Sequence, residues 1–207
     1  SDGVHSYTAT ATDAAGNTSL ATGAYSVTVD TKTTVAISGF ATDSGTVGDF
    51  RTNDTTPTIN GTAEAGATVV LSQNGSVVAT TTADGSGKWS YTSADLADST
   101  YTYSATATDA AGNTATTANY TLTIDHTPPV VAITTFASDS GTQGDFITND
   151  TTPTISGTAE KGATVVLSQN DVVVATMTAS NSTGNWSYST SSKTPLADGV
   201  YTYTATA

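Results

Sequence analysis

The sequence has no cysteine and little positive charge, and both features exclude common classes of protein. Its 207 residues include 18 acidic side chains against five Lys or Arg, which gives a formal net charge of −13. Nucleic acids and anionic membrane surfaces are bound by clustered Lys and Arg, so we expect neither as a partner. Without cysteine, disulfides cannot stabilise a small core. No apolar run approaches the length of a membrane span, so membrane insertion is not expected.

Residues typical of catalytic centres are also scarce. The two histidines are His5, in a predicted strand, and His126, in a predicted linker. No Ser-His-Asp set, phosphate-binding loop or paired catalytic carboxylate is recognisable. We therefore expect no enzymatic activity and no catalytic residue. A secretion signal is not visible, but an internal piece of a longer protein would not show one.

A long internal repeat dominates what the sequence does contain. Residues 43–59 return as residues 139–155, an offset of 96, and shorter segments repeat at the same spacing. A unit of this length is a whole domain, and arrays of near-identical domains usually serve as spacers or stalks. The expected organisation is the last two strands of a repeat in 1–30, a complete repeat in 31–126, and a repeat lacking its last strand in 127–207.

Apolar and polar residues alternate throughout 31–126, which is the pattern of half-buried strands. Turn signals such as Asn74-Gly75 separate the predicted strands, which lie near residues 35, 58, 68, 77, 89, 101 and 120. Seven short strands in about a hundred residues predict an all-β fold of tandem immunoglobulin-like seven-stranded β-sandwich domains. Trp89 and Trp186 are expected in the core rather than stacked on a sugar, and Tyr101 is expected to bind the preceding loop as a tyrosine corner.

Several carboxylates fall in loops that the strand order places at one end of the sandwich. Because consecutive strands alternate in direction, Asp30, Glu64 and Asp109 should converge there, with Asn113 beside Asp109. Three carboxylates at one corner repel one another unless a cation lies between them. Ca²⁺ accepts irregular all-oxygen coordination, whereas Mg²⁺ demands octahedral geometry and Zn²⁺ favours His or Cys. The sequence therefore predicts a calcium site, with the alternative that Asp and Asn merely cap their loops.

The repeat extends this prediction to further residues. Asp13 corresponds to Asp109, Asp125 to Asp30, and Glu160 to Glu64. A second candidate calcium site is the Gly-rich loop 43–54 with its copy 139–150. Its candidate ligands are Asp43, Asp49 and Asp54, and in the copy Asp139, Asp145 and Asp150. This loop lacks the spacing of an EF-hand, so an ordinary capping loop is an equal alternative. Phe50 and Phe146 in the two loops are expected to plug the base of the sandwich.

Four segments resemble the bacterial Ig-like repeats of giant surface adhesins, which include the type I-secreted RTX adhesins and the biofilm-associated, Bap-like adhesins of Gram-negative bacteria. The segments are 61–69, 157–165, 105–113 and the junction 124–129, and the resemblance covers essentially the whole chain. It implies a cell-surface location, an extended stalk that supports adhesion and biofilm formation, and Ca²⁺ at the domain junctions. The abundance of Thr, Ser, Ala and Gly suits an extracellular protein, and a cytosolic acidic protein is the alternative.

Two other functions stay open: a carbohydrate- or receptor-binding module, and an accessory module of an extracellular polysaccharide-active enzyme. The expected partners are the neighbouring repeats of the same chain. Two strands alone are marginal in water, so residues 1–30 should be ordered by completing an open domain. That domain could be 127–207 of another chain, in head-to-tail contact, or both ends could belong to domains completed by further residues.

Overall fold

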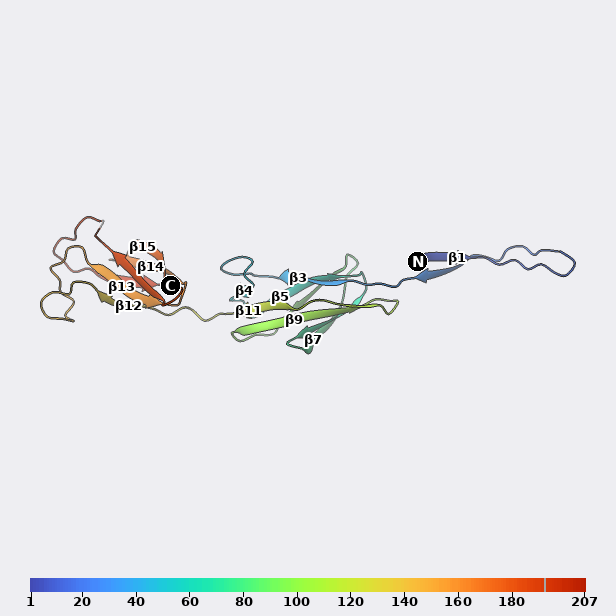
Figure 1. Ribbon diagram of the computed structural model, residues 1–207, viewed down its shortest axis with the longest axis horizontal. Coiled ribbons are helices and arrows are strands. Elements are labelled where there is room, and N and C mark those ends of the chain that lie inside the picture. Colours follow the sequence, from blue (N-terminus) through green and yellow to red (C-terminus); the bar gives the residue numbers. More distant parts are fainter. Residues whose placement is uncertain (192) are drawn as a thin grey trace. The chain divides into compact units, whose positions relative to one another are not determined.

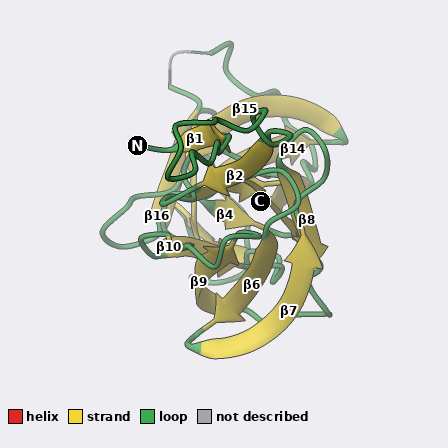
Figure 2. Cartoon of the chain, turned by 90° about the vertical axis from the view of Figure 1, so that its right-hand side faces the viewer, coloured by secondary structure: helices red, strands yellow, loops and turns green. Residues whose placement is uncertain are grey.

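The computed structural model describes residues 1–191 and 193–207, which divide into two compact units, 1–126 and 127–207. Strands and connecting loops make up these residues, and no helix occurs among them (Figure 2). Consequently, the part of the chain that the structure describes contains no helix that could cross a membrane. The all-β prediction is confirmed.

Residues 1–30 form a long β-hairpin. Strands β1 (Gly3–Tyr7) and β2 (Tyr25–Val29) pair antiparallel, with Gly3 opposite Val29 (Figure 1). The apolar side chains on these strands are exposed, for example Val4 at 70% and Tyr25 at 73%. The hairpin has no core of its own because two strands have no second sheet on which to pack.

Residues 31–126 form a sandwich of two sheets. The first sheet has the order β3 (Val35–Phe40), β5 (Thr58–Ala63) and β8 (Lys88–Thr92). The second has the order β4 (Arg51–Thr52), β11 (Tyr120–Ile124), β9 (Ser99–Thr108), β6 (Thr68–Gln73) and β7 (Ser76–Thr82), and β10 (Thr114–Thr116) also pairs with β9. All seven predicted strands are present. The very short strands β4 and β10 were not predicted, because such short segments carry no periodic pattern.

The core lies between these two sheets and is built from the alternating apolar positions of each strand. Ile59, Leu71, Tyr103 and Leu122 are fully buried. Trp89 is 4% exposed and covers Gly61 so closely that a Cβ there would lie 2.0 Å from the indole. The glycine thus makes room for the ring, and the prediction of a core tryptophan is confirmed.

The second unit, 127–207, repeats most of this arrangement. One sheet has the order β12 (Val131–Phe136), β13 (Thr154–Ala159) and β16 (Asn185–Ser189), and the other β15 (Val172–Thr178), β14 (Thr164–Gln169) and β17 (Tyr203–Thr206). The tyrosine corner occurs in both units: the Tyr101 hydroxyl donates to Ala97 O at 3.1 Å, and that of Tyr201 to Ala197 O at 3.0 Å.

The predicted position of two phenylalanines is wrong. Phe50 is 50% exposed and forms a T-shaped ring pair with Tyr120, with 5.6 Å between ring centroids. Phe146 is 77% exposed and lies against Phe136. Both residues have a left-handed backbone, with φ of 61° and 59°, and neither ring is buried under the core.

Candidate metal centre

Three carboxylates that are far apart in the sequence lie together at one end of the first unit. Asp30 follows β2, Glu64 lies between β5 and β6, and Asp109 follows β9. One oxygen from each lies within 4.8 Å of the others. Asp109 is buried, Asp30 is half-buried and Glu64 is exposed. The two sheets and the linker thus bring together the three acids that the strand order predicted to converge.

The loop after β9 holds Asp109 in place. Asp109 Oδ1 accepts hydrogen bonds from the backbone N–H of Ala111 at 2.9 Å and of Asn113 at 2.8 Å. Asp109 Oδ2 accepts one from Asn113 Nδ2 at 2.8 Å, and the same nitrogen donates to Asp30 O at 3.1 Å. Asn113 therefore ties the linker backbone to the acidic loop, and its side-chain oxygen is the atom through which it could ligate a cation.

The hydrogen bonds also keep Asp109 ionised. Burial by itself would raise the pKa of Asp109, but the hydrogen bonds from the Asn113 side chain and from the backbone of Asn113, Ala111 and Gly112 lower it below its ordinary value. The pKa of Asp13, in the copy of this loop within the hairpin, is also lowered, chiefly by the side chain of Asn17. Asp13 belongs to no such group of acids in the described residues.

The spacing of the three oxygens fits Ca²⁺. Ca–O distances of about 2.3–2.6 Å place ligand oxygens no more than about 5 Å apart, and oxygens within 4.8 Å of one another meet this limit. The donor set contains only oxygen, which disfavours Zn²⁺. A carboxylate oxygen has more than one lone pair, so Asp109 can accept its hydrogen bonds and still bind a cation. Bound Ca²⁺ would offset the mutual repulsion of three negative charges.

Among the described residues, the six acids of loops 43–54 and 139–150 belong to no such cluster. They cap the backbone of their own loops: Asp43 Oδ2 accepts from Gly48 N at 2.6 Å, Asp49 from Arg51 N at 3.0 Å, and Asp54 from Thr56 N at 2.9 Å. The copy has the same bonds, from Gly144 N to Asp139 at 2.6 Å, Ile147 N to Asp145 at 3.0 Å, and Thr152 N to Asp150 at 2.8 Å. The backbone of Thr152 also lowers the pKa of Asp150. These hydrogen bonds are the ones expected if the acids cap their own loops instead of binding a cation.

One atom in each of these loops is not accounted for by capping. Asp43 Oδ1 and Asp139 Oδ1 are both buried without a hydrogen-bond partner among the described residues. A buried carboxylate oxygen is unfavourable unless a donor or a cation compensates it. Calcium at this loop therefore stays a prediction, with this oxygen as its first candidate ligand.

The second predicted junction site involves residues of different units. Asp125 belongs to the first unit and Glu160 to the second, so their joint role stays a prediction. Within its own unit Asp125 forms an ion pair with Arg51, with 2.9 Å between Nη2 and Oδ2. The sequence pattern did not indicate Arg51. The available signal was that it is the only arginine of the chain and that Ile147 replaces it in the repeat.

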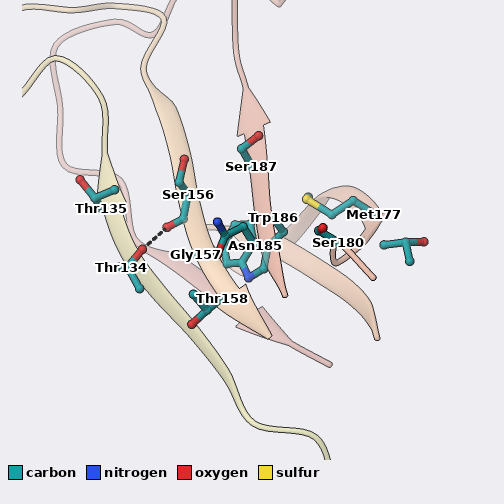
Figure 3. Close-up of a pocket in the computed structure, with 11 residues that line it drawn as sticks. Thr134, Thr135, Ser156, Gly157, Thr158, Met177, Ser180, Asn185, Trp186 and Ser187 are labelled. Atoms are coloured by element: carbon teal, nitrogen blue, oxygen red, sulfur yellow. Dashed lines mark hydrogen bonds between the residues drawn. The ribbon is translucent and has the colours of Figure 1, made fainter. Parts of the chain in front are cut away.

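An open pocket of about 580 Å³ in the second unit, lined largely by Thr and Ser, bears on the alternative of carbohydrate binding (Figure 3). Its lining includes Thr134, Ser156 and Trp186, and Thr134 Oγ1 donates to Ser156 O at 3.3 Å. Trp186 is only 4% exposed, because its ring covers Gly157 as Trp89 covers Gly61. The cavity therefore offers no open tryptophan face on which a sugar could stack.

The two packed sheets of residues 31–126 define an Ig-like β-sandwich, and the comparison with known families agrees. The sequence matches the family of bacterial Ig-like domains over residues 32–126 and again over residues 127–207. The chain belongs to this family, which confirms the predicted Ig-like repeats. Among curated protein sequences, none matches the chain.

Several solved structures are similar. A 1.5-MDa bacterial ice-binding adhesin, studied for its retention on the host cell surface, is 24% identical over 91% of this chain and 63% of its own, with a TM-score of 0.38. Fibronectin(III)-like modules of CbhA from Clostridium thermocellum are 15% identical over 83% and 84%, with a TM-score of 0.38. The BSP domain of a biofilm associated protein is 21% identical over 76% and 26%, with a TM-score of 0.29. The chain thus spans 63% of the adhesin chain. Likenesses this distant carry no argument about function.

Proposed function

We propose that this chain is a structural extender, or stalk segment, of a large bacterial cell-surface adhesin, in which Ca²⁺ bound at the repeat junctions stiffens the array. The observation that supports this most is the group of Asp30, Glu64 and Asp109, whose oxygens lie within 4.8 Å of one another. Asp30 belongs to the linker and the other two to the domain that follows. A cation bound to all three would fasten the linker to that domain.

Stiffening follows from the geometry of the ligands. A linker between two domains is free to turn about its backbone dihedrals unless contacts hold it. Asn113 Nδ2 already holds the carbonyl of Asp30 at 3.1 Å. A cation on the Asp30 side chain would add a second, stronger attachment in the same residue. The rod would then project a distal binding domain away from the cell and so support adhesion and biofilm formation.

The proposed setting is extracellular, on the surface of a Gram-negative bacterium that exports the protein by type I secretion. A calcium site built from a few partly exposed carboxylates suits extracellular modules, whose dissociation constants lie at about 10⁻⁴ to 10⁻³ M. The proposed partners are the neighbouring repeats. We propose no enzymatic activity, because the sequence contains no recognisable catalytic set.

Calorimetric titration of chelator-stripped protein with CaCl₂ tests this function. The wild type should bind Ca²⁺ in the micromolar to millimolar range, and Asp30→Asn and Glu64→Gln should each weaken or abolish that binding. Asp13→Asn is the matched control, because Asp13 lies in the same Asp-Ala-Ala-Gly-Asn loop but belongs to no acidic group in the described residues. Absence of heat in the wild type, or an equal loss in Asp13→Asn, would contradict the proposal.

A further inference from the structure

The side chain of Asn113 joins the linker to the loop that carries Asp109. Its Nδ2 atom donates to Asp30 O at 3.1 Å and to Asp109 Oδ2 at 2.8 Å. A carbonyl and an ionised carboxylate accept hydrogen bonds but cannot donate them, so the nitrogen of the amide, and not its oxygen, must face both partners. One amide group thus divides its two N–H bonds between the linker and the domain that follows.

The neighbouring linker residues bond locally instead. Lys32 N donates to Asp30 Oδ1 at 3.2 Å, and Thr31 Oγ1 donates to Asp2 Oδ1 at 2.8 Å. Neither bond reaches a strand or loop of the sandwich, whereas the bond from Asn113 spans 83 residues of sequence. Asn113 and Asp30 are both half-buried, which strengthens their bond relative to one in open water. This bond therefore holds Asp30 against the sandwich without any cation.

The hairpin contains the same loop without this attachment. Asn17 Nδ2 donates to Asp13 Oδ2 at 2.9 Å, as Asn113 does to Asp109. Among the described residues, Asn17 Nδ2 donates to no linker carbonyl. The loop thus forms with only the bond between its own Asp and Asn, and the bond to the linker is an additional property of Asn113.

We propose that Asn113 is a positioning residue of the junction: its amide fastens the linker to the domain before a cation binds, so that Ca²⁺ meets the Asp30 carboxylate already beside the other two acids. This inference rests on the proposed function of the junction. A site that is assembled in only a fraction of the molecules binds with an affinity reduced by that fraction. A freely turning linker would assemble the site part of the time, and the Asn113 bond raises that fraction.

The junction then has two levels of attachment. At low calcium the linker is held by the amide of Asn113 alone, and at high calcium it is held by the amide and by the cation together. Because the amide bond reduces the ordering that the cation must impose, the two attachments reinforce each other.

Backbone ¹⁵N relaxation of the isotope-labelled 207-residue chain tests this role in chelator, where calcium contributes nothing. The heteronuclear NOE at the amides of Asp30, Thr31 and Lys32 reports the mobility of the linker on the picosecond to nanosecond timescale. In Asn113→Ala these NOE values should fall relative to the wild type, because the linker loses its attachment. Calcium titration of the same variant should give an affinity about two- to ten-fold weaker, the size expected of one neutral hydrogen bond.

Two further variants separate the linker bond from the loop. Asn17→Ala removes the matching loop bond in the hairpin and should change neither the linker mobility nor the calcium affinity. Asn113→Asp keeps the length of the side chain and an oxygen atom but cannot donate to Asp30 O, so it should release the linker in chelator as Asn113→Ala does. The loop should persist in both Asn113 variants, because the backbone N–H groups of Ala111 and of position 113 still donate to Asp109.

Linker amides that stay as ordered in Asn113→Ala and Asn113→Asp as in the wild type would overturn the role of Asn113 and leave the proposed calcium function intact. An unchanged calcium affinity in Asn113→Ala, or an equal loss of linker order in Asn17→Ala, would overturn it in the same way. Absence of calcium binding in the wild type would refute the proposed function and this inference together, even where the linker loosens in Asn113→Ala.

Discussion

Residues 31–126 and residues 127–207 share most of their strand sequences but differ in how deeply their cores are buried. Tyr103 is fully buried in the first, whereas its counterpart Tyr203 is half-buried in the second. The difference is β11, whose Leu122 and Ile124 are 0% and 1% exposed. The described residues of 127–207 include no counterpart of this strand, and this unit has a groove of about 730 Å³ whose lining includes Phe146 and Val200.

This comparison shows that one strand has two roles. β11 closes the core by pairing antiparallel with β9 and parallel with β4, and it leads directly into the linker residue Asp125. The strand that completes the sandwich, β11, is therefore also the strand that positions the first residue of the linker. We therefore expect domain stability and linker geometry to be coupled through this strand.

The largest loss of stability is expected when a buried side chain of β11 is shortened. Leu122→Ala removes a fully buried side chain and should destabilise residues 31–126 by about 2–5 kcal/mol, because a cavity replaces it. Chemical denaturation measures the change. Val27, the counterpart in the hairpin, is 40% exposed and has no core around it, so Val27→Ala should change stability by less than about 0.5 kcal/mol. Similar losses in the two variants would contradict the assigned role of β11.

The next largest change in stability is expected from Ca²⁺ binding to Asp30, Glu64 and Asp109. At a free Ca²⁺ concentration a hundred times the dissociation constant, binding should stabilise residues 31–126 by about 2.7 kcal/mol relative to chelator. Thermal unfolding with Ca²⁺ and with chelator measures this difference in stability. The difference should vanish in Asp109→Asn and persist in Asp13→Asn.

Small-angle scattering gives an independent measure of how far Ca²⁺ restricts the linkers, through the maximum dimension of the chain. Because a bridged linker has less freedom, the maximum dimension should be larger with Ca²⁺ than with chelator. Equal dimensions in the two conditions would leave the linker prolines and packing as the source of stiffness.

A smaller effect is expected at the tyrosine corners. Tyr101→Phe and Tyr201→Phe each remove one hydrogen bond to a backbone carbonyl, which should cost about 1 kcal/mol. Urea denaturation of the two variants compares the corner of the first unit with that of the second. A loss well above this in either variant would mean that the hydroxyl has a further partner.

The smallest effect should appear in the pH dependence. The pKa of Asp109 is lower in the folded chain than its ordinary value, so the folded state favours the ionised form. Its contribution to stability is complete above the unfolded pKa, near about 4, and is lost as pH falls through the lower folded pKa. In chelator, the urea midpoint of the wild type should therefore fall below about pH 4 more steeply than that of Asp109→Asn. If the urea midpoints of the two proteins fell in parallel with pH, Asp109 would make no such contribution to stability.

Some features of this protein followed from short-range sequence patterns alone. Alternating apolar residues fixed the strands, and Asn74-Gly75 predicted the hairpin turn, where both residues have positive φ, 50° and 80°. The capping bonds of Asp109 are equally local, since Asp13 makes the same bonds with Ala15 and Asn17 in a hairpin with no core around it. Strand direction was enough to indicate that Asp30, Glu64 and Asp109 share one end of the sandwich.

Other features depended on contacts between segments far apart in the sequence. The sequence by itself determined the fold class, the repeats and the acids at the junction, because periodicity and strand order are written in neighbouring residues. Only the tertiary structure left Phe50 half exposed, buried Asp109 and paired Arg51 with Asp125. The last pairing depends on the parallel register of β4 with β11, which sets Arg51 opposite Thr123. No local pattern encodes that register, because two residues of β4 gain their place only when the rest of the sheet has formed.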